Sequence, residues 1–152
     1  MLAKFATDRG DYEAAEKLVE DAIERAPWFD ELHYHKAMLL TQTKRYSEAV
    51  EELQQLRIAQ PDLAKPLVFM AYIKDVHQGL TAEAEKLLVQ AMDKGWDRKY
   101  SKTGAMNLAA IYIKTNRVSF AEGVYSILLD RYPNDPEIEE LKSSLTANKQ
   151  DL

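Results

Sequence analysis

The sequence predicts an all-α fold in which helical hairpins stack side by side into a solenoid. The first observation behind this prediction is an internal repeat with a period of 34 residues. The second is composition, because the helix formers Ala, Glu, Leu and Lys dominate while Gly and Pro occur only five times each. The third is that apolar residues recur three or four positions apart, as they do along one face of an amphipathic helix.

The repeat rests on landmarks that share one spacing without a gap. Tyr12-Glu13-Ala14-Ala15 recurs as Tyr46-Ser47-Glu48-Ala49, Pro27 recurs as Pro61, and Ala3 recurs as Ala37 and Ala71. Two helices that cross closely need a small side chain at the contact, with larger residues filling the space around it. The alanines therefore mark the expected helix crossings, at Ala37, Ala71 and Ala109 and at Ala15, Ala49, Ala84 and Ala121.

Each unit is expected to contain two helices joined by a short turn. In the second unit the first helix covers residues 31–43, the turn follows at Lys44-Arg45-Tyr46, and Ser47 is the expected N-cap of the second helix. Pro61 ends that second helix, because proline cannot continue a helix interior. The second helix of the first unit ends in the same way, before Pro27.

The third and fourth units depart from the strict period. Ala84 follows Ala49 by 35 residues, which places one extra residue in the turn 77–81. No proline closes the third unit, so we expect Gly95 to end its second helix. Ala121 follows Ala84 by 37 residues, which indicates a connection at 95–101 that is longer by three residues.

The sequence predicts an incomplete first hairpin at the N-terminus and a capping helix at the C-terminus. The first helix of the first unit lacks its opening turn, as in an excised fragment or a degenerate first repeat. At the other end Asp135 is the expected N-cap of a final helix, with Pro136 in its first turn. Ile138, Leu141 and Leu145 form one apolar stripe on an otherwise polar helix, which is typical of a cap on a solenoid.

This pattern resembles the tetratricopeptide repeat family, whose repeats share the period and the positions of the alanines, aromatic residues and prolines. The resemblance implies a right-handed α–α superhelix that forms one domain over residues 1–152. Its units are expected at about 1–29, 30–63, 64–98 and 102–135, followed by a capping helix at about 136–147.

Composition and motifs argue against several function classes. The chain has no Cys, so thiolate zinc sites and cysteine nucleophiles are excluded, and it has no glycine-rich phosphate loop. His33 and His35 lie roughly 200° apart around a helix and cannot hold one metal ion together. The net charge of −5 argues against a nucleic-acid binder. We therefore expect no catalysis, cofactor, metal or membrane span, and expect the cytoplasm first and the periplasm second as the compartment.

The family resemblance also implies where a partner binds. In this family the first helix of each unit lines a concave groove, and the matching positions here are Tyr34, Met38, Thr41, Lys65, Val68, Tyr72, Asp75, Val76, Met106, Ile113 and Lys114. Many of these side chains are apolar, and aromatic residues and Met are common at protein interfaces. The hypothesis is a non-catalytic scaffold that binds a peptide or helical segment of a partner protein in this groove.

Alternatives to this hypothesis remain open at the level of sequence. The incomplete first hairpin leaves an apolar face that a second copy could cover, which gives a homo-oligomer. The chain could instead be an accessory domain of a larger enzyme or of a secretion or assembly complex. A third alternative is RNA contact through Lys94, Arg98, Lys99 and Lys102, which lie near Trp96 and Tyr100; an aromatic cover on the end of the core explains the same residues.

Overall fold

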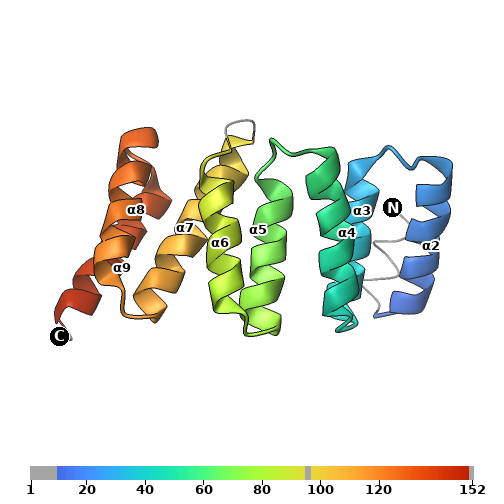
Figure 1. Ribbon diagram of the computed structural model, residues 1–152, viewed down its shortest axis with the longest axis horizontal. Helices are drawn as coiled ribbons and strands as arrows, with labels where there is room; N and C mark the ends of the chain where they lie inside the picture. The colour runs from blue at the N-terminus through green and yellow to red at the C-terminus, as the bar shows by residue number, and fades with distance from the viewer. Residues whose placement is uncertain (1–9, 95–96, 151–152) are drawn as a thin grey trace.

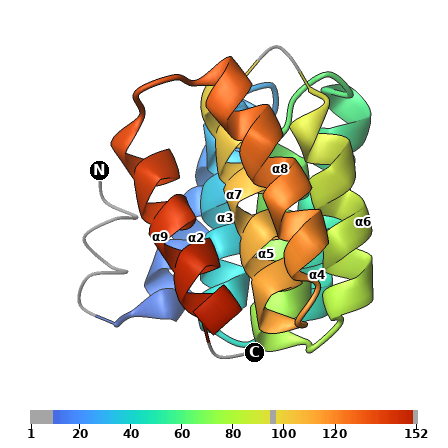
Figure 2. The same ribbon diagram turned by 90° about the vertical axis from the view of Figure 1, so that its left-hand side faces the viewer.

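The computed structural model describes residues 10–94 and 97–150, and over these ranges it is a row of helices. The elements are α2 (Tyr12–Arg25), α3 (Asp30–Gln42), α4 (Tyr46–Ala59), α5 (Lys65–Tyr72), the π-helical turn η1 (Ile73–His77), α6 (Thr81–Met92), α7 (Arg98–Lys114), α8 (Val118–Arg131) and α9 (Pro136–Gln150). Figure 1 shows them standing side by side in chain order, and Figure 2 looks along the row. The prediction of an all-α helical solenoid is confirmed.

The three hairpin turns from the second unit onward each contain one residue in the left-handed region. Lys44, Gly79 and Asn116 each adopt a positive φ, of 63°, 68° and 57°, at the point where the first helix of a hairpin ends. In the second unit the next backbone N–H, that of Arg45, donates to the carbonyl of Leu40 at 2.8 Å. This bond is the one that closes a Schellman motif at a helix C-terminus.

The tight turn corrects one expectation about Ser47. The helix α4 begins at Tyr46, with Arg45 as its N-cap and no side-chain cap. The carbonyl of Arg45 already accepts from the N–H of Ala49 at 3.0 Å, so the residue that closes one helix also starts the next. Ser47 therefore lies inside α4 and not at its cap.

The extra residue of the third unit is taken up inside a helix. The N–H of Gln78 donates to the carbonyl of Ile73 at 3.1 Å, and the N–H of Leu80 donates to the carbonyl of Lys74 at 2.8 Å, one residue further back than in the other two turns. The helix widens into η1, and the turn itself keeps its left-handed residue, Gly79. The sequence pattern predicts the extra residue in the turn 77–81, whereas the structure accommodates it about one helical turn earlier, in η1.

The longer connection before the fourth unit is also mostly helical. Residues 98–101 form the first turn of α7, which has 17 residues where α3 has 13. Asp97 is the N-cap of α7, but its carboxylate accepts from the backbone N–H groups of Ala64 and Lys65 at 2.7 and 2.8 Å. Asp97 thus caps the neighbouring helix α5. Gly95 and Trp96 lie outside the described residues.

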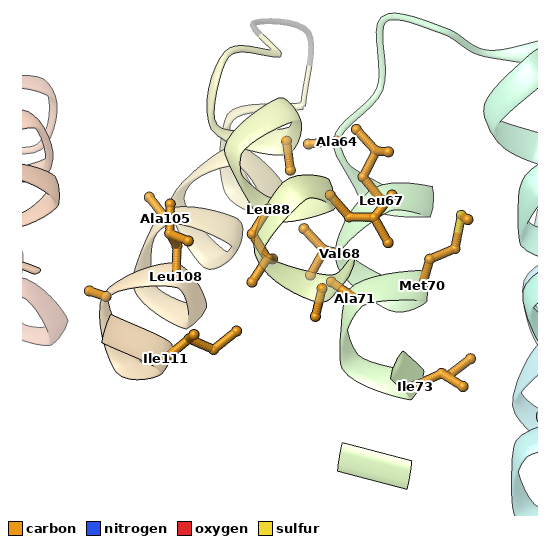
Figure 3. Packing of buried hydrophobic residues seen from close by; sticks show 14 of the residues in the cluster. Ala64, Leu67, Val68, Met70, Ala71, Ile73, Leu88, Ala105, Leu108 and Ile111 are labelled. Carbon is orange, nitrogen blue, oxygen red and sulfur yellow. The ribbon is translucent and has the colours of Figure 1, made fainter. Parts of the chain in front are cut away.

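The core runs along the row between the helices. The alanines that the repeat placed at helix crossings are buried: Ala15, Ala37, Ala49, Ala71, Ala84, Ala109 and Ala121, while Ala3 lies outside the described residues. Figure 3 shows Val68 and Ala71 of α5 facing Leu88 of α6. Close contact at small residues lets the larger aliphatic side chains fill the remaining space.

The helix α9 covers the end of this core as expected. Ile138, Leu141 and Leu145 are buried, and Asp135 Oδ1 accepts from the backbone N–H of Glu137 at 3.0 Å. Asp135 thus accepts at the start of α9, as predicted, and α9 continues to Gln150, beyond the expected end at about 147. Among the described residues, no helix combines the length and the apolar character that crossing a bilayer requires.

Candidate functional site

A pocket of about 320 Å³ lies between α5 with η1 on one side and α7 on the other. Its lining consists of Ala71, Tyr72, Asp75, Val76, Leu88, Asn107, Ala110, Ile111 and Lys114. The buried side chains among them, those of Ala71, Leu88 and Ile111, belong to the core and form an apolar floor. The pocket is therefore built on helices whose positions the core already holds.

Two large apolar side chains of this pocket are exposed. Tyr72 is 51% exposed and Val76 is 57% exposed, although both lie on the helical segment that also supplies Ala71 to the core. An exposed aromatic ring next to an exposed aliphatic side chain offers contact area that a second molecule can bury. These two residues are the apolar contact points of the site.

A charged pair lies at the edge of the pocket. Asp75 Oδ1 accepts from Thr81 Oγ1 at 2.7 Å and from Lys114 Nζ at 2.9 Å, and Oδ2 accepts from Lys114 at 3.1 Å. Burial raises the pKa of Asp75, but the hydrogen bonds from Thr81 and Lys114 outweigh burial and lower it below the usual value. The carboxylate is therefore ionised at neutral pH and well supplied with donors.

The remaining polar groups of the pocket are open to a ligand. The Lys114 side chain is 56% exposed, so its ammonium still faces solvent while it pairs with Asp75. The Asn107 amide, half-buried in the wall, makes no hydrogen bond within the described residues. An amide offers both a donor and an acceptor, as an extended peptide backbone requires.

Four of the residues predicted for the groove line this pocket, namely Tyr72, Asp75, Val76 and Lys114. Tyr34 and Val68 are buried in the core instead, at 5% exposure each, and so present little surface to a partner. Met106 and Ile113 are half-buried and pack against the same core. They differ from the prediction because α7 turns the face with Asn107, Ala110, Ile111 and Lys114 toward α5.

The other predicted residues lie on α3 and at the start of α5. Met38 is exposed on α3, away from the pocket lining, and the Thr41 hydroxyl donates to the carbonyl of Ala37 at 2.8 Å. Lys65 Nζ lies 3.9 Å from the centre of the Tyr34 ring and 2.7 Å from Glu31 Oε1. Lys65 is thus engaged by an ion pair and a cation–π contact within the protein itself.

Leu88, Asn107 and Ile111 were missed from the sequence. Leu88 lies on a second helix of a hairpin, which the family resemblance does not assign to the groove. Asn107 and Ile111 share the spacing of Lys114 along one face of α7, and that spacing is a usable signal. The family resemblance assigned Met106 and Ile113 to the groove by their repeat positions, and apolarity could not correct this, because a core side chain and a groove side chain look alike in sequence.

Two of the three histidines, His33 and His77, make structural contacts within the described residues. His33 Nδ1 lies 2.5 Å from Glu52 Oε1, and its Nε2 donates to the Pro27 carbonyl at 3.1 Å. Desolvation lowers the pKa of His33, but these hydrogen bonds and the nearby carboxylates outweigh it and raise the pKa above 6.5. His77 stacks on the ring of Tyr46 at 4.8 Å between centres, and His35 is exposed.

The basic residues proposed for RNA contact are divided by the structure. Lys102 pairs with Asp135 at 2.9 Å and with Glu137 at 2.6 Å. Arg98 lies over the ring of Tyr132 at 5.4 Å, and Lys99 lies 5.6 Å from the ring of Tyr100. Of the four basic residues proposed for RNA contact, Lys102 is therefore already neutralised by two carboxylates.

Comparison with known proteins agrees with this architecture. Residues 6–70 match the family model described as tetratricopeptide repeat. This segment belongs to the tetratricopeptide repeat family. A tetratricopeptide repeat protein from Parabacteroides merdae ATCC 43184 has a TM-score of 0.75 at 14% identity, and the match covers 98% of this chain and 58% of that one. The chain thus spans little more than half the length of that structure.

Other comparisons are less informative. A thermophilic tetratricopeptide repeat protein from Thermus thermophilus matches with a TM-score of 0.42 at 18% identity, over 95% of this chain and 96% of that one. No curated protein matches the chain. The likeness to the Parabacteroides structure, at its low identity, shows a shared fold over nearly the whole chain.

The tetratricopeptide repeat fold is in general a scaffold for protein–protein interaction, because stacked hairpins present an extended surface to a partner. The pocket lining lies entirely beyond the segment that the family model matches, since that segment ends at residue 70 and the lining begins at Ala71. It is formed by the third and fourth hairpins of the tetratricopeptide repeat solenoid.

Proposed function

We propose that this chain is a non-catalytic protein interaction module that binds a peptide or helical segment of a partner in the pocket between α5 and α7. The observation that carries the proposal is the exposure of Tyr72 and Val76 above an apolar floor. Binding hot spots combine an aromatic or aliphatic anchor with a surrounding polar rim. Here Asp75, Asn107 and Lys114 supply that rim.

The geometry favours recognition because the site is preformed. Tyr72 and Ala110 lie on helices that the buried core positions, so binding does not require those helices to order first. The titratable pair in the lining supports a binding role over catalysis. A general base works best with a pKa near the operating pH, whereas Lys114 and Thr81 hold the pKa of Asp75 below its usual value.

The proposal is tested with a library of random peptides displayed on phage and selected on the purified protein. Selected peptides are synthesised and their affinities measured by calorimetry for the parent chain and for a double variant, Tyr72→Ala with Val76→Ala. The matched control is Ile58→Ala, because Ile58 is 64% exposed but lies on α4, away from the pocket. A third variant, Met38→Ala, tests whether the binding surface extends onto α3.

We expect the double variant to bind the selected peptides at least about tenfold more weakly, since losing one hot-spot side chain costs about 2 kcal/mol or more. The Ile58→Ala control keeps parent affinity. All variants keep their unfolding temperatures within about 2 °C, because exposed apolar side chains add little to stability. Unchanged affinity in the double variant moves the site elsewhere, and failure to select any peptide contradicts the proposal.

Self-association is distinguished in the same preparation. Light scattering gives the molar mass across a range of concentrations, and a dimer that the double variant abolishes would assign the pocket to a second copy of the chain. A monomer leaves the pocket available to a partner protein.

A further inference from the structure

Basic and acidic residues are divided unequally between the two sets of helices. The first helices of the hairpins, α3, α5 with η1, and α7, carry seven basic and three acidic residues. The second helices, α2, α4, α6 and α8, carry five basic and twelve acidic residues. The helix α7 contains Arg98, Lys99, Lys102 and Lys114 and no acidic residue at all. Of the first helices, α5 with η1 and α7 supply most of the pocket lining, and together they carry six basic residues and one acidic residue.

The pocket itself has the same polarity. The carboxylate of Asp75 is 15% exposed and accepts from both Thr81 and Lys114, so little of it is left for a ligand. The Lys114 side chain is more than half exposed, and its ammonium carries three N–H groups. A molecule in the pocket therefore meets open donors at one end and apolar carbon over most of the remaining lining.

We propose that the segment bound in the pocket carries an apolar side chain with a carboxylate beside it in the chain. This inference rests on the proposed function. The apolar side chain contacts Tyr72, Val76 and Ala110, and the carboxylate accepts from Lys114. Hydrogen bonds between charged groups are shorter and stronger than neutral ones, so this contact adds selectivity to apolar burial.

One ammonium can serve two carboxylates in this fold. Lys102 already does so, because its Nζ lies 2.9 Å from Asp135 and 2.6 Å from Glu137. Within the described residues, Lys114 pairs with the single carboxylate of Asp75. A ligand carboxylate would give Lys114 the arrangement that Lys102 has, while Thr81 continues to donate to Asp75.

The π-turn η1 supplies the acidic member of the charged pair, and Lys114 of α7 supplies the basic one. Asp75 and Val76 both lie in η1, which exists because the third unit is one residue longer. The corresponding positions of the second unit, counted from Ala37, hold Thr41 and Gln42 and supply no charge. The side-chain oxygen of Gln78 is buried and has no hydrogen-bond partner in the part of the chain that the structure describes. Deleting Gln78 restores the spacing of the other turns and should convert η1 to regular α-helix.

The test is a nitrogen-15 NMR titration with three short blocked peptides: leucine flanked by glutamates, leucine flanked by lysines, and serine flanked by glutamates. We expect the first peptide to shift the amides of Tyr72, Val76 and Asn107 and to bind at least about tenfold more tightly than the second, since steering and pairing by charge favour it. The third peptide should not bind measurably, because the apolar contact is absent.

Two variants test whether Lys114 and η1 produce the preference for glutamate-flanked peptides. Lys114→Met should lower the affinity for the glutamate-flanked leucine peptide about tenfold and remove its advantage over the lysine-flanked peptide. The control Lys142→Met removes the same charge from an exposed site on α9 and should leave the affinity unchanged. The Gln78 deletion should lose binding while keeping helical circular dichroism; if it does not fold, the Lys114→Met result alone decides the proposal.

The outcomes separate this inference from the proposed function. Equal or tighter binding of the lysine-flanked peptide, with shifts at the same amides, overturns the carboxylate preference and leaves peptide binding in the pocket intact. If no peptide shifts the pocket amides, the inference is overturned, and the phage selection then determines whether the pocket binds any peptide.

Discussion

Gly104 allows α7 to pack closely against α5 and α6. The change in stability on replacing Gly104 by alanine tests how close this packing is. An alanine Cβ at this position would lie 3.1 Å from the Cβ of Ala91 and 3.2 Å from Cγ2 of Val68. Both neighbours are buried, and neither can move alone. The Cβ of Ala91 has no side-chain torsion, and the β-branched Val68 is restricted to one main rotamer in a helix.

Two opposing effects determine the magnitude. Alanine is favoured over glycine in a helix interior by about 1 kcal/mol. Adding a methyl group to a well-packed contact costs about 1–3 kcal/mol, because whole helices must shift to admit it. We therefore expect Gly104→Ala to lower the free energy of unfolding by about 1 kcal/mol, despite the gain in helix propensity.

Gly123 on α8 provides the matched control. It is exposed, and an added Cβ would meet nothing within 4 Å, so Gly123→Ala should gain the propensity of about 1 kcal/mol in full. Thermal unfolding followed by circular dichroism should give shifts of about 2–4 °C in opposite directions for the two variants. If Gly104→Ala raises the unfolding temperature as much as Gly123→Ala does, the close packing of α7 against α5 and α6 is refuted.

Three further predictions concern stability. Asp97→Ala removes the acceptor at the start of α5 and should cost about 1–2 kcal/mol in urea unfolding, whereas an equal stability would contradict the cap. The raised pKa of His33 predicts a stabilising contribution that is full below pH 6.5 and is lost as pH rises through the folded-state value; His33→Gln should flatten the dependence of unfolding free energy on pH. Ala49→Leu overpacks a fully buried crossing and should lower the unfolding temperature by several degrees, at a cost of about 1–3 kcal/mol.

The repeat spacing predicted the hairpins well because a helix crossing imposes a small residue at a definite interval. The buried alanines and the capping helix after Asp135 follow directly from that requirement. Spacing counts residues but does not say how the backbone accommodates an additional one. The extra residue near His77 therefore appeared as a longer turn in the prediction, whereas the chain widens a helix instead.

The pocket was predictable only in part for a related reason. Tyr72, Asp75, Val76 and Lys114, which the resemblance assigned to the groove, line the pocket. Met106 and Ile113 do not line it, because the rotation of α7 about its axis depends on what the neighbouring helices bury. The rotation of α7 is determined by contacts between helices, such as those of Gly104 with Ala91 and Val68, and cannot be read from the sequence of α7 alone.

The two hydrogen bonds that Asp97 accepts at the start of α5 also affect how this array can be shortened. The carboxylate of Asp97, just before the fourth hairpin, caps the first helix of the third hairpin. A cut between these two hairpins would therefore leave the backbone N–H groups of Ala64 and Lys65 without their acceptor. Any shortened or rearranged version of the chain must therefore keep Asp97 together with α5 or supply another cap for the N-terminus of α5.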